Sequence, residues 1–276
     1  MAQERTNNRE VIGVVPAGGR ATRVSPLPCS KELYPVGARF VEDGSPRPKV
    51  VSHFLLEGIR RAGANKTFIV LREGKWDIPT YYNDGTALLD MHLAYLMMRL
   101  PYGAPFSVDQ AYPFVREATV LFGFPDMLFE PADAFVRLVE RQSETRADIV
   151  LGVWTLEPAG LADDRLVIDA AGRVRHIEVK STNPDLPLTW VNAAWTPSFT
   201  KFMHAYLTEA LSSGRQMSKQ TSGLSREIIV GDVLAAAVES GLHVNAVQFP
   251  GAAYIDIGTP EALITLHSAD RPSYLK

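Results

Sequence analysis

The feature that most constrains the fold is the alternation of short β-branched apolar runs with longer stretches of helical apolar spacing. Val11–Pro16 is a predicted buried strand that ends at a glycine-rich turn, and Thr67–Leu71 is a second one. Between them, Lys49–Ala62 carries apolar residues at helical spacing, and Gly63 follows as a stop signal. Strand, helix and strand in this order predict a right-handed crossover and a parallel sheet.

The same alternation continues along the chain. Val120–Phe124 and Ile149–Trp154 are further predicted strands, with a predicted helix over Ala132–Glu144 between them. A later helix is expected over Ile228–Ser240, and a last strand over Val244–Phe249. This order of elements is typical of the α/β class.

Two segments depart from the alternation. Leu166–Asp169 and Arg173–Val179 flank a short turn that contains Gly172, which predicts a β-hairpin inserted into the parallel fold. Ser212–Ser225 is rich in Ser, Gly and polar residues and is expected to form a mobile loop. No repeat or long linker divides the chain, so we expect one domain over residues 1–276.

Composition excludes several classes of protein. The chain has 276 residues, 46% of them hydrophobic, with 28 Lys+Arg against 31 Asp+Glu and a formal charge of −3. These values are typical of a folded globular protein, and without a basic block they argue against a nucleic-acid partner. No apolar run is long enough for a membrane span. The single cysteine, Cys29, cannot form an internal disulfide, so we expect a cytoplasmic protein.

The most informative segment is the turn after the first strand. Gly18 and Gly19 follow it directly, and without a Cβ their backbone N–H groups can approach a phosphate closely. Arg23 and Lys31 lie on the loop that follows and offer cations suited to phosphate oxygens. The spacing matches neither the Walker loop nor the GxGxxG dinucleotide fingerprint.

This segment resembles the signature GGxGTRLxPLTxxxPKxLxPV of sugar-1-phosphate nucleotidyltransferases. The resemblance continues in order through Pro48–Gly63, Tyr95–Phe114, Val120–Asp126, Arg173–Lys180 and Gly251–Leu263. It implies a Rossmann-like, three-layer α/β/α fold with a mixed, mostly parallel central sheet and an inserted hairpin. It also implies a Mg²⁺-dependent reaction in which an NTP and a sugar 1-phosphate, or a related phosphorylated polyol, give an NDP-sugar and pyrophosphate.

The resemblance implies a role for each matching residue. Residues 11–126 would bind the NTP, and residues 127–265 the sugar phosphate. The implied nucleotide contacts are Ala17, Gly18, Gly19, Met98, Gly103 and Asp126, and the implied catalytic cations are Arg23 and Lys31. The implied sugar-phosphate contacts are Lys180 and Glu178, and the implied Mg²⁺ ligands are Asp126 and Asp256. Asn192 is either a further sugar-phosphate contact or a strand residue satisfied by backbone.

Several positions depart from the family pattern. Met98 stands where the family has a base-reading Gln, and a thioether cannot both donate and accept as an amide does. Val179 stands where the family has Glu, with Glu178 one place earlier, and Asp164 aligns with a family glycine. Ala21 replaces the last glycine of GGxGTR, which is tolerable if its φ is negative and costly otherwise.

Two alternatives stay open. A glycosyltransferase of the same fold class would want a DxD motif, which Asp126-Met127-Leu128 lacks. A non-catalytic nucleotide-binding or regulatory homologue is compatible with the departures. Family members often assemble as dimers or tetramers, so a homo-oligomer is also compatible with the sequence.

Overall fold

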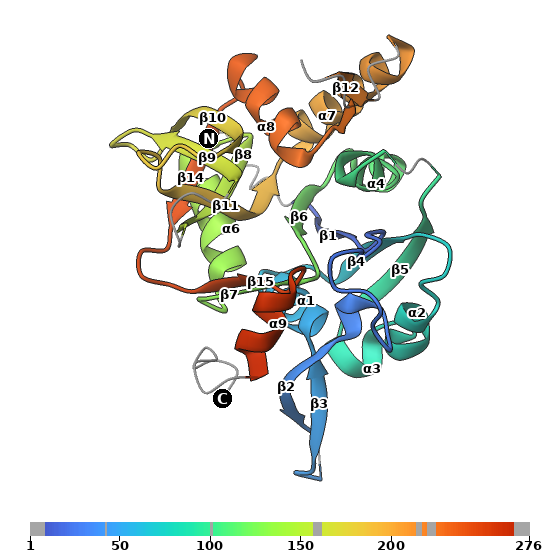
Figure 1. Cartoon of the computed structure of the whole chain (residues 1–276). Coiled ribbons are helices and arrows are strands. Elements are labelled where there is room, and N and C mark those ends of the chain that lie inside the picture. Colours follow the sequence, from blue (N-terminus) through green and yellow to red (C-terminus); the bar gives the residue numbers. More distant parts are fainter. Residues whose placement is uncertain are drawn as a thin grey trace, which may run out of the picture.

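The computed structural model describes residues 9–41, 43–99, 102–156, 162–213, 217–219 and 225–267. A nine-stranded sheet with the order β10-β9-β11-β6-β1-β4-β5 lies at its centre, and β8 joins it by pairing with both β11 and β14 (Figure 1). Its strands are β1 (Val11–Pro16), β4 (Lys66–Leu71), β5 (His92–Met97), β6 (Thr119–Gly123), β8 (Ile149–Thr155), β9 (Asp163–Ile168), β10 (Val174–Ser181), β11 (Leu188–Trp195) and β14 (Val244–Gln248).

The order of strands sets where ligands can bind. β6, β1, β4 and β5 are parallel neighbours, so their carboxyl ends meet at one edge of the sheet. β11 runs antiparallel between β6 and β8, and β8 pairs in parallel with β14. The mixed α/β fold with its mostly parallel central sheet, predicted above, is therefore confirmed. In open α/β sheets, ligands bind outside the carboxyl ends of the strands.

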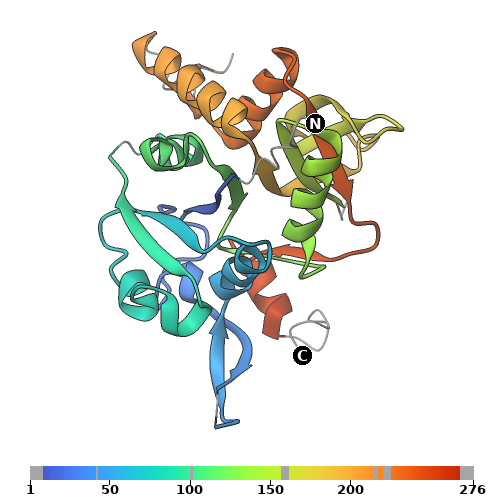
Figure 2. The same ribbon diagram turned by 180° about the vertical axis from the view of Figure 1, so that it is seen from behind.

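Helices cover both faces of the sheet. α1 (Val51–Arg61), α2 (Asp77–Tyr82), α3 (Thr86–Leu89) and α6 (Ala134–Thr145) contribute apolar side chains to one buried cluster. α4 (Ala104–Asp109), α5 (Tyr112–Val115), α7 (Pro197–Ser212) and α8 (Val230–Glu239) contribute to the cluster on the opposite face. α4, α7 and α8 gather at the top in both views (Figures 1 and 2). The molecule is thus a three-layer α/β/α structure.

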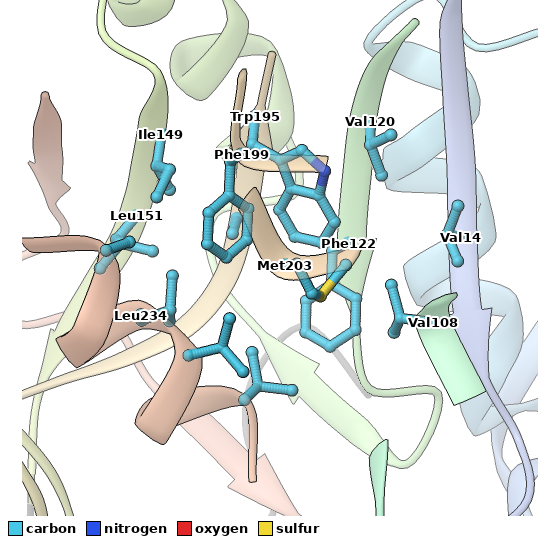
Figure 3. Close-up of a cluster of buried hydrophobic side chains, with 14 of the residues drawn as sticks. Val14, Val108, Val120, Phe122, Ile149, Leu151, Trp195, Phe199, Met203 and Leu234 are labelled. Atoms are coloured by element: carbon cyan, nitrogen blue, oxygen red, sulfur yellow. The ribbon is translucent and has the colours of Figure 1, made fainter. Parts of the chain in front are cut away.

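The second cluster illustrates how the layers are held together (Figure 3). Phe122 and Trp195 project from neighbouring strands, and Phe199 and Met203 of α7 pack onto them. These side chains are at most 2% exposed. The indole N–H of Trp195 donates to the Thr200 hydroxyl at 3.0 Å, which satisfies its only polar atom.

The inserted hairpin is confirmed, and two other predictions need correction. β9 and β10 pair antiparallel, and the Asp169 carboxylate closes their turn by accepting the N–H groups of Ala171 and Arg173. The predicted loop Ser212–Ser225 contains β12 (Met217–Lys219), which pairs with β13 (Ser225–Glu227). Residues 214–216 and 220–224 of that prediction lie outside the described residues.

The predicted helix Lys49–Ala62 begins two residues late. Lys49 and Val50 end β3 (Pro46–Val50), which pairs with β2 (Pro35–Phe40) in a hairpin that projects from the body in both views (Figures 1 and 2). Pro46 and Pro48 fix an extended backbone here, because proline disfavours the helical region in the residue before it. No helix in the described part of the chain is long and apolar enough to cross a bilayer.

Candidate active site

Four segments that each follow a parallel strand converge at the carboxyl edge of the sheet. The glycine turn follows β1, Arg72 follows β4, Met98 follows β5, and Asp126 lies three residues beyond β6. All four line one cavity of about 760 Å³. Its position is the one that parallel α/β sheets use for ligands.

The two glycines of the turn lie close to other residues of the cavity wall. A Cβ on Gly18 would lie 3.3 Å from the Met98 thioether, and a Cβ on Gly19 would lie 3.6 Å from Lys31 Cε. Ala17 has a different role: it is buried, and its N–H donates to the Val70 carbonyl at 2.8 Å, which prolongs the sheet. Pro16, Gly18 and Gly19 therefore line the cavity, whereas Ala17 does not.

Ala21 has a φ of +53°, in the left-handed region. From the sequence, we expect an alanine here to be tolerable at negative φ and costly at positive φ. The structure has the costly, positive φ. A left-handed residue with a Cβ is less stable by roughly 1–2 kcal/mol. Such strain at the edge of a cavity is typical of functional loops.

Lys31 lies in a short 3-10 helix, η1 (Lys31–Leu33), that is held on both sides. The Ser30 N–H and hydroxyl both donate to the Asp77 carboxylate at 2.7 Å. Next to Lys31, Glu32 is 2% exposed and accepts from Lys75 at 2.5 and 2.6 Å. Burial raises the pKa of Glu32 and lowers that of Lys75, and the ion pair between them offsets part of each shift.

The ammonium of Lys31 forms an ion pair with the Asp126 carboxylate. Burial by itself would lower the pKa of Lys31, but the charge of Asp126 and the hydrogen bond to it, together with the charges of Glu32 and Asp256, outweigh burial. The pKa of Lys31 therefore lies above its ordinary value, and the side chain stays charged near neutral pH.

A small two-stranded sheet brings the two predicted metal aspartates together. β7 (Met127–Phe129) pairs antiparallel with β15 (Tyr254–Asp256), so Asp256 lies opposite Met127 (Figure 1). The N–H of Ile257 donates to the Asp126 carbonyl at 3.0 Å. The helix α9 (Pro260–His267) follows.

The two carboxylates fit a divalent cation. Asp126 contacts Lys31 through Oδ2 and Asp256 accepts the Gly258 N–H through Oδ1, and a carboxylate has lone pairs for further partners. Burial, together with the neighbouring charge of Asp126, raises the pKa of Asp256. A cation between the carboxylates would offset that repulsion, and Mg²⁺ prefers one or two carboxylates completed by phosphate oxygens.

A second cavity, of about 780 Å³, adjoins the first, and Asp126 lines both. Arg23, Lys180 and Asp256 also line the second cavity. Arg23 lies 3.8 Å from Asp256, and its side chain is 65% exposed. Lys180 has a φ of +52°, and its backbone N–H donates to the Asp164 carboxylate at 3.1 Å. Each half of the site thus contains predicted cations.

Met98 and Gly103 line another part of the first cavity, where Arg99 and Glu227 also contribute to the wall. The Ser107 hydroxyl donates to the Met98 sulfur at 3.0 Å, so the thioether at the family's Gln position is itself hydrogen-bonded. Gly103 has a φ of +108°, and a Cβ there would lie 2.5 Å from the Ile228 carbonyl. Only glycine fits at this position.

Two predicted acceptor residues lie elsewhere. Glu178 accepts the Ser181 hydroxyl at 2.7 Å and is not among the residues that line the second cavity. Asn192 is fully buried in β11, opposite Gly123 and Gly152. Its amide atoms have no hydrogen-bond partner among the described residues, and it too is absent from the cavity wall.

Sequence reasoning missed three residues that shape the site. Asp164, a departure from the family glycine, accepts both the Lys180 N–H and the Trp190 indole N–H at 3.1 Å. Lys75 holds Glu32, and no local pattern pointed to that pair. Arg72 lies directly after a predicted strand, and a charged residue at the carboxyl end of a parallel strand indicates a place in the ligand site.

Solved structures share this architecture. A crystal structure of a glucose-1-phosphate thymidylyltransferase from Bacillus anthracis in complex with sucrose superposes with a TM-score of 0.75, over 95% of each chain, at 15% identity. A UDP-glucose pyrophosphorylase in complex with UDP-glucose gives a TM-score of 0.70 at 15% identity, over 93% of this chain and 97% of that one. This chain has the nucleotidyltransferase fold of sugar pyrophosphorylases.

The nucleotidyltransferase fold agrees with the resemblance found in the sequence motifs. No protein-family model and no curated protein matches the chain. At 15% identity the structural likeness establishes the fold, while activity and substrate have to be argued from the site.

Proposed function

We propose that this chain is a nucleotidyltransferase that condenses an NTP with a sugar 1-phosphate, or a related phosphorylated polyol, to give an NDP-sugar and pyrophosphate. One observation carries the proposal: Lys31, Asp126 and Asp256 meet where two cavities join. A transfer between two substrates needs a donor and an acceptor on opposite sides of one reacting phosphorus. The junction at Asp126 is suited to hold that phosphorus.

The two cavities suggest a division of labour. We assign the NTP to the cavity formed mainly by residues 11–126, where Gly18 and Gly19 would offer backbone N–H groups to phosphate oxygens. We assign the acceptor to the cavity formed mainly by residues 127–265, where Lys180 would hold its phosphate. Arg23 lies 3.8 Å from Asp256, lines the same cavity and would offer a second cation to that phosphate.

The proposed reaction is an in-line attack by an acceptor phosphate oxygen on the α-phosphorus, with pyrophosphate as the leaving group. Bound between Asp126 and Asp256, Mg²⁺ would supply charge neutralisation at the α-phosphate. Lys31, kept protonated by its raised pKa, would offset the negative charge that develops there. Positioning and charge, without a covalent enzyme intermediate, account for most catalysis in phosphoryl transfer.

A pyrophosphate-release assay tests the proposal. ATP, CTP, GTP, UTP and dTTP are each incubated with Mg²⁺ and pooled sugar 1-phosphates, and we expect release that requires both an NTP and an acceptor. Nucleotide binding without release across the whole matrix would favour a non-catalytic homologue. Ala21 in the left-handed region and Met98 at the base position are the observations that favour that second candidate.

A further inference from the structure

Arg72 lies on the wall of the nucleotide cavity, and the proposed reaction assigns it no contact with either substrate. It follows β4 directly and is half-buried. It lines the nucleotide cavity and also a neighbouring hollow of about 290 Å³. Gly19, Arg20 and Lys31 line both spaces as well, so the glycine turn separates them.

The charges around this hollow are unevenly matched. Lys31 is paired with Asp126 and Lys75 with Glu32, while Asp77 accepts two hydrogen bonds from Ser30. In contrast, Arg72 makes one contact of 3.3 Å, to the Glu73 carbonyl. Its Nε atom is buried and has no hydrogen-bond partner among the described residues.

Carboxylates do not balance this guanidinium within the described part of the chain. Glu73 and Glu227 line the same cavity, but both are exposed, and neither forms an ion pair with Arg72 among the described residues. A half-buried guanidinium that lacks an acceptor is stabilised by an anion, and its planar fork suits phosphate oxygens.

We propose that Arg72, with Arg20, which lines the same two spaces, binds the β- and γ-phosphates of the NTP and the pyrophosphate that leaves. This inference rests on the proposed function. If the α-phosphate lies at Asp126, the base and the leaving phosphates share the rest of the cavity. Arg72 lines this cavity and the adjoining hollow together with Arg20 and Lys31, so three cations surround the place where the two spaces meet, which suits the leaving phosphates.

The chemistry of the step is consistent with this assignment. A new bond forms between an acceptor phosphate oxygen and the α-phosphorus, and the bond from that phosphorus to the bridging oxygen of the β-phosphate breaks. The bridging oxygen keeps the electron pair, so the leaving pyrophosphate gains negative charge and no proton has to move. Arg72 would stabilise that charge as it develops.

Inorganic pyrophosphate is the probe, because it carries no base and no sugar. Its binding to the full chain is measured by calorimetry with Mg²⁺ present. We expect Arg72→Gln to weaken binding by about tenfold to a hundredfold, the range for a lost hydrogen bond to a charged group. We expect Arg72→Lys, which keeps the charge, to retain part of the affinity. Arg47→Gln, an exposed arginine of the β2–β3 hairpin, is the matched control and should bind as the wild type does.

The outcomes separate this inference from the proposed function. Equal affinity in the wild type and Arg72→Gln, or no binding by the wild type, overturns the inference. If the two affinities are equal and the wild type still turns over an NTP and an acceptor, the transferase proposal is retained without the phosphate subsite. Arg72-dependent binding without any turnover would retain the phosphate subsite and overturn the transferase. Circular dichroism of each variant establishes that it is folded, and Arg20→Gln gives a second test should Arg72→Gln not fold.

Discussion

The two halves of the cavity are built differently. The nucleotide half is the cavity assigned to the NTP. There, two contacts hold the turn that carries Lys31, and we call them its braces: the Asp77 carboxylate accepts from Ser30, and the buried Glu32 pairs with Lys75. In the acceptor half, Arg23 has a side chain that is 65% exposed. The other cation of that half, Lys180, is exposed and held in the left-handed region by one backbone contact to Asp164.

This difference fits the chemistry proposed for each half. Phosphate groups are the same in every NTP, so their site gains from a preorganised arrangement. Acceptors differ in size and in the number of hydroxyl groups, and the departures from the family at Asp164 and Val179 fall on that side. We infer that the braced half supports catalysis and the exposed half determines the acceptor.

The largest effect is expected at the junction of the halves. Asp126→Asn would remove a charge that both Lys31 and the proposed Mg²⁺ contact, so we expect turnover to fall by roughly two to four decades. Steady-state pyrophosphate release measures it. Asp90→Asn is the control, because the Asp90 side chain is 89% exposed and pairs with Arg60 at the surface. Near-normal turnover in Asp126→Asn would remove Asp126 from the reacting centre.

The brace itself can be broken. Glu32→Gln leaves the buried Lys75 charge without its partner. Lys75→Met leaves the buried Glu32 charge without its partner in the same way. Each variant should lower the free energy of unfolding by about 3–5 kcal/mol. The double variant Glu32→Met/Lys75→Met should recover most of that loss, because both buried charges are gone. Urea unfolding measures all three proteins.

A matched surface pair gives the reference for that measurement. Arg137 and Asp133 form an i,i+4 pair with side chains 50% and 45% exposed, so Arg137→Gln should cost at most about 1 kcal/mol. If the Glu32 and Lys75 variants cost no more than Arg137→Gln, the turn that carries Lys31 is not braced by this pair.

Loss of the Lys180 charge in the acceptor half should act on affinity for the acceptor. Lys180→Met is expected to raise the KM for the acceptor at least about tenfold, the equivalent of 1.4 kcal/mol, and to leave the KM for the NTP unchanged. Lys180→Gly should lose the same affinity but unfold at higher urea than Lys180→Met, because glycine accepts a φ of +52°. A rise in both KM values would contradict the division of the two halves.

The sequence predicted the parts of the site that depend on local pattern. Gly18 and Gly19 follow a strand with clear periodicity, and Asp126 follows another, so parallel pairing alone brings them to one edge. It could not predict the Glu32–Lys75 pair, because that contact joins two segments whose proximity depends on how β4 and α1 pack.

Two other contacts show where local pattern is ambiguous. β7 and β15 are three residues each, too short for periodicity to predict the pairing that brings Asp256 to Asp126. Glu178 lies one place from the family position and accepts the Ser181 hydroxyl, and the register of β10 shifts between these two residues. A bulge shifts which face each side chain occupies, and sequence spacing alone does not reveal it.

The smallest expected effect concerns Cys29, the single cysteine, which lines the hollow beside the braced turn. Burial, and then the negative charges of Asp77 and Glu32, raise its pKa above the ordinary value for a thiol. A raised pKa keeps the thiol neutral to higher pH, and the thiolate is the reactive form.

Iodoacetamide should therefore alkylate Cys29 more slowly than free cysteine at pH 8, and the two rates should converge only above the raised pKa. Asp77→Asn removes one of the two charges and one of the two carboxylate oxygens that accept from Ser30, so it should shift the rate profile towards lower pH. If the alkylation rate of the wild type levels off at the same pH as that of free cysteine, or at a lower pH, the braced turn does not hold its carboxylates close to Cys29.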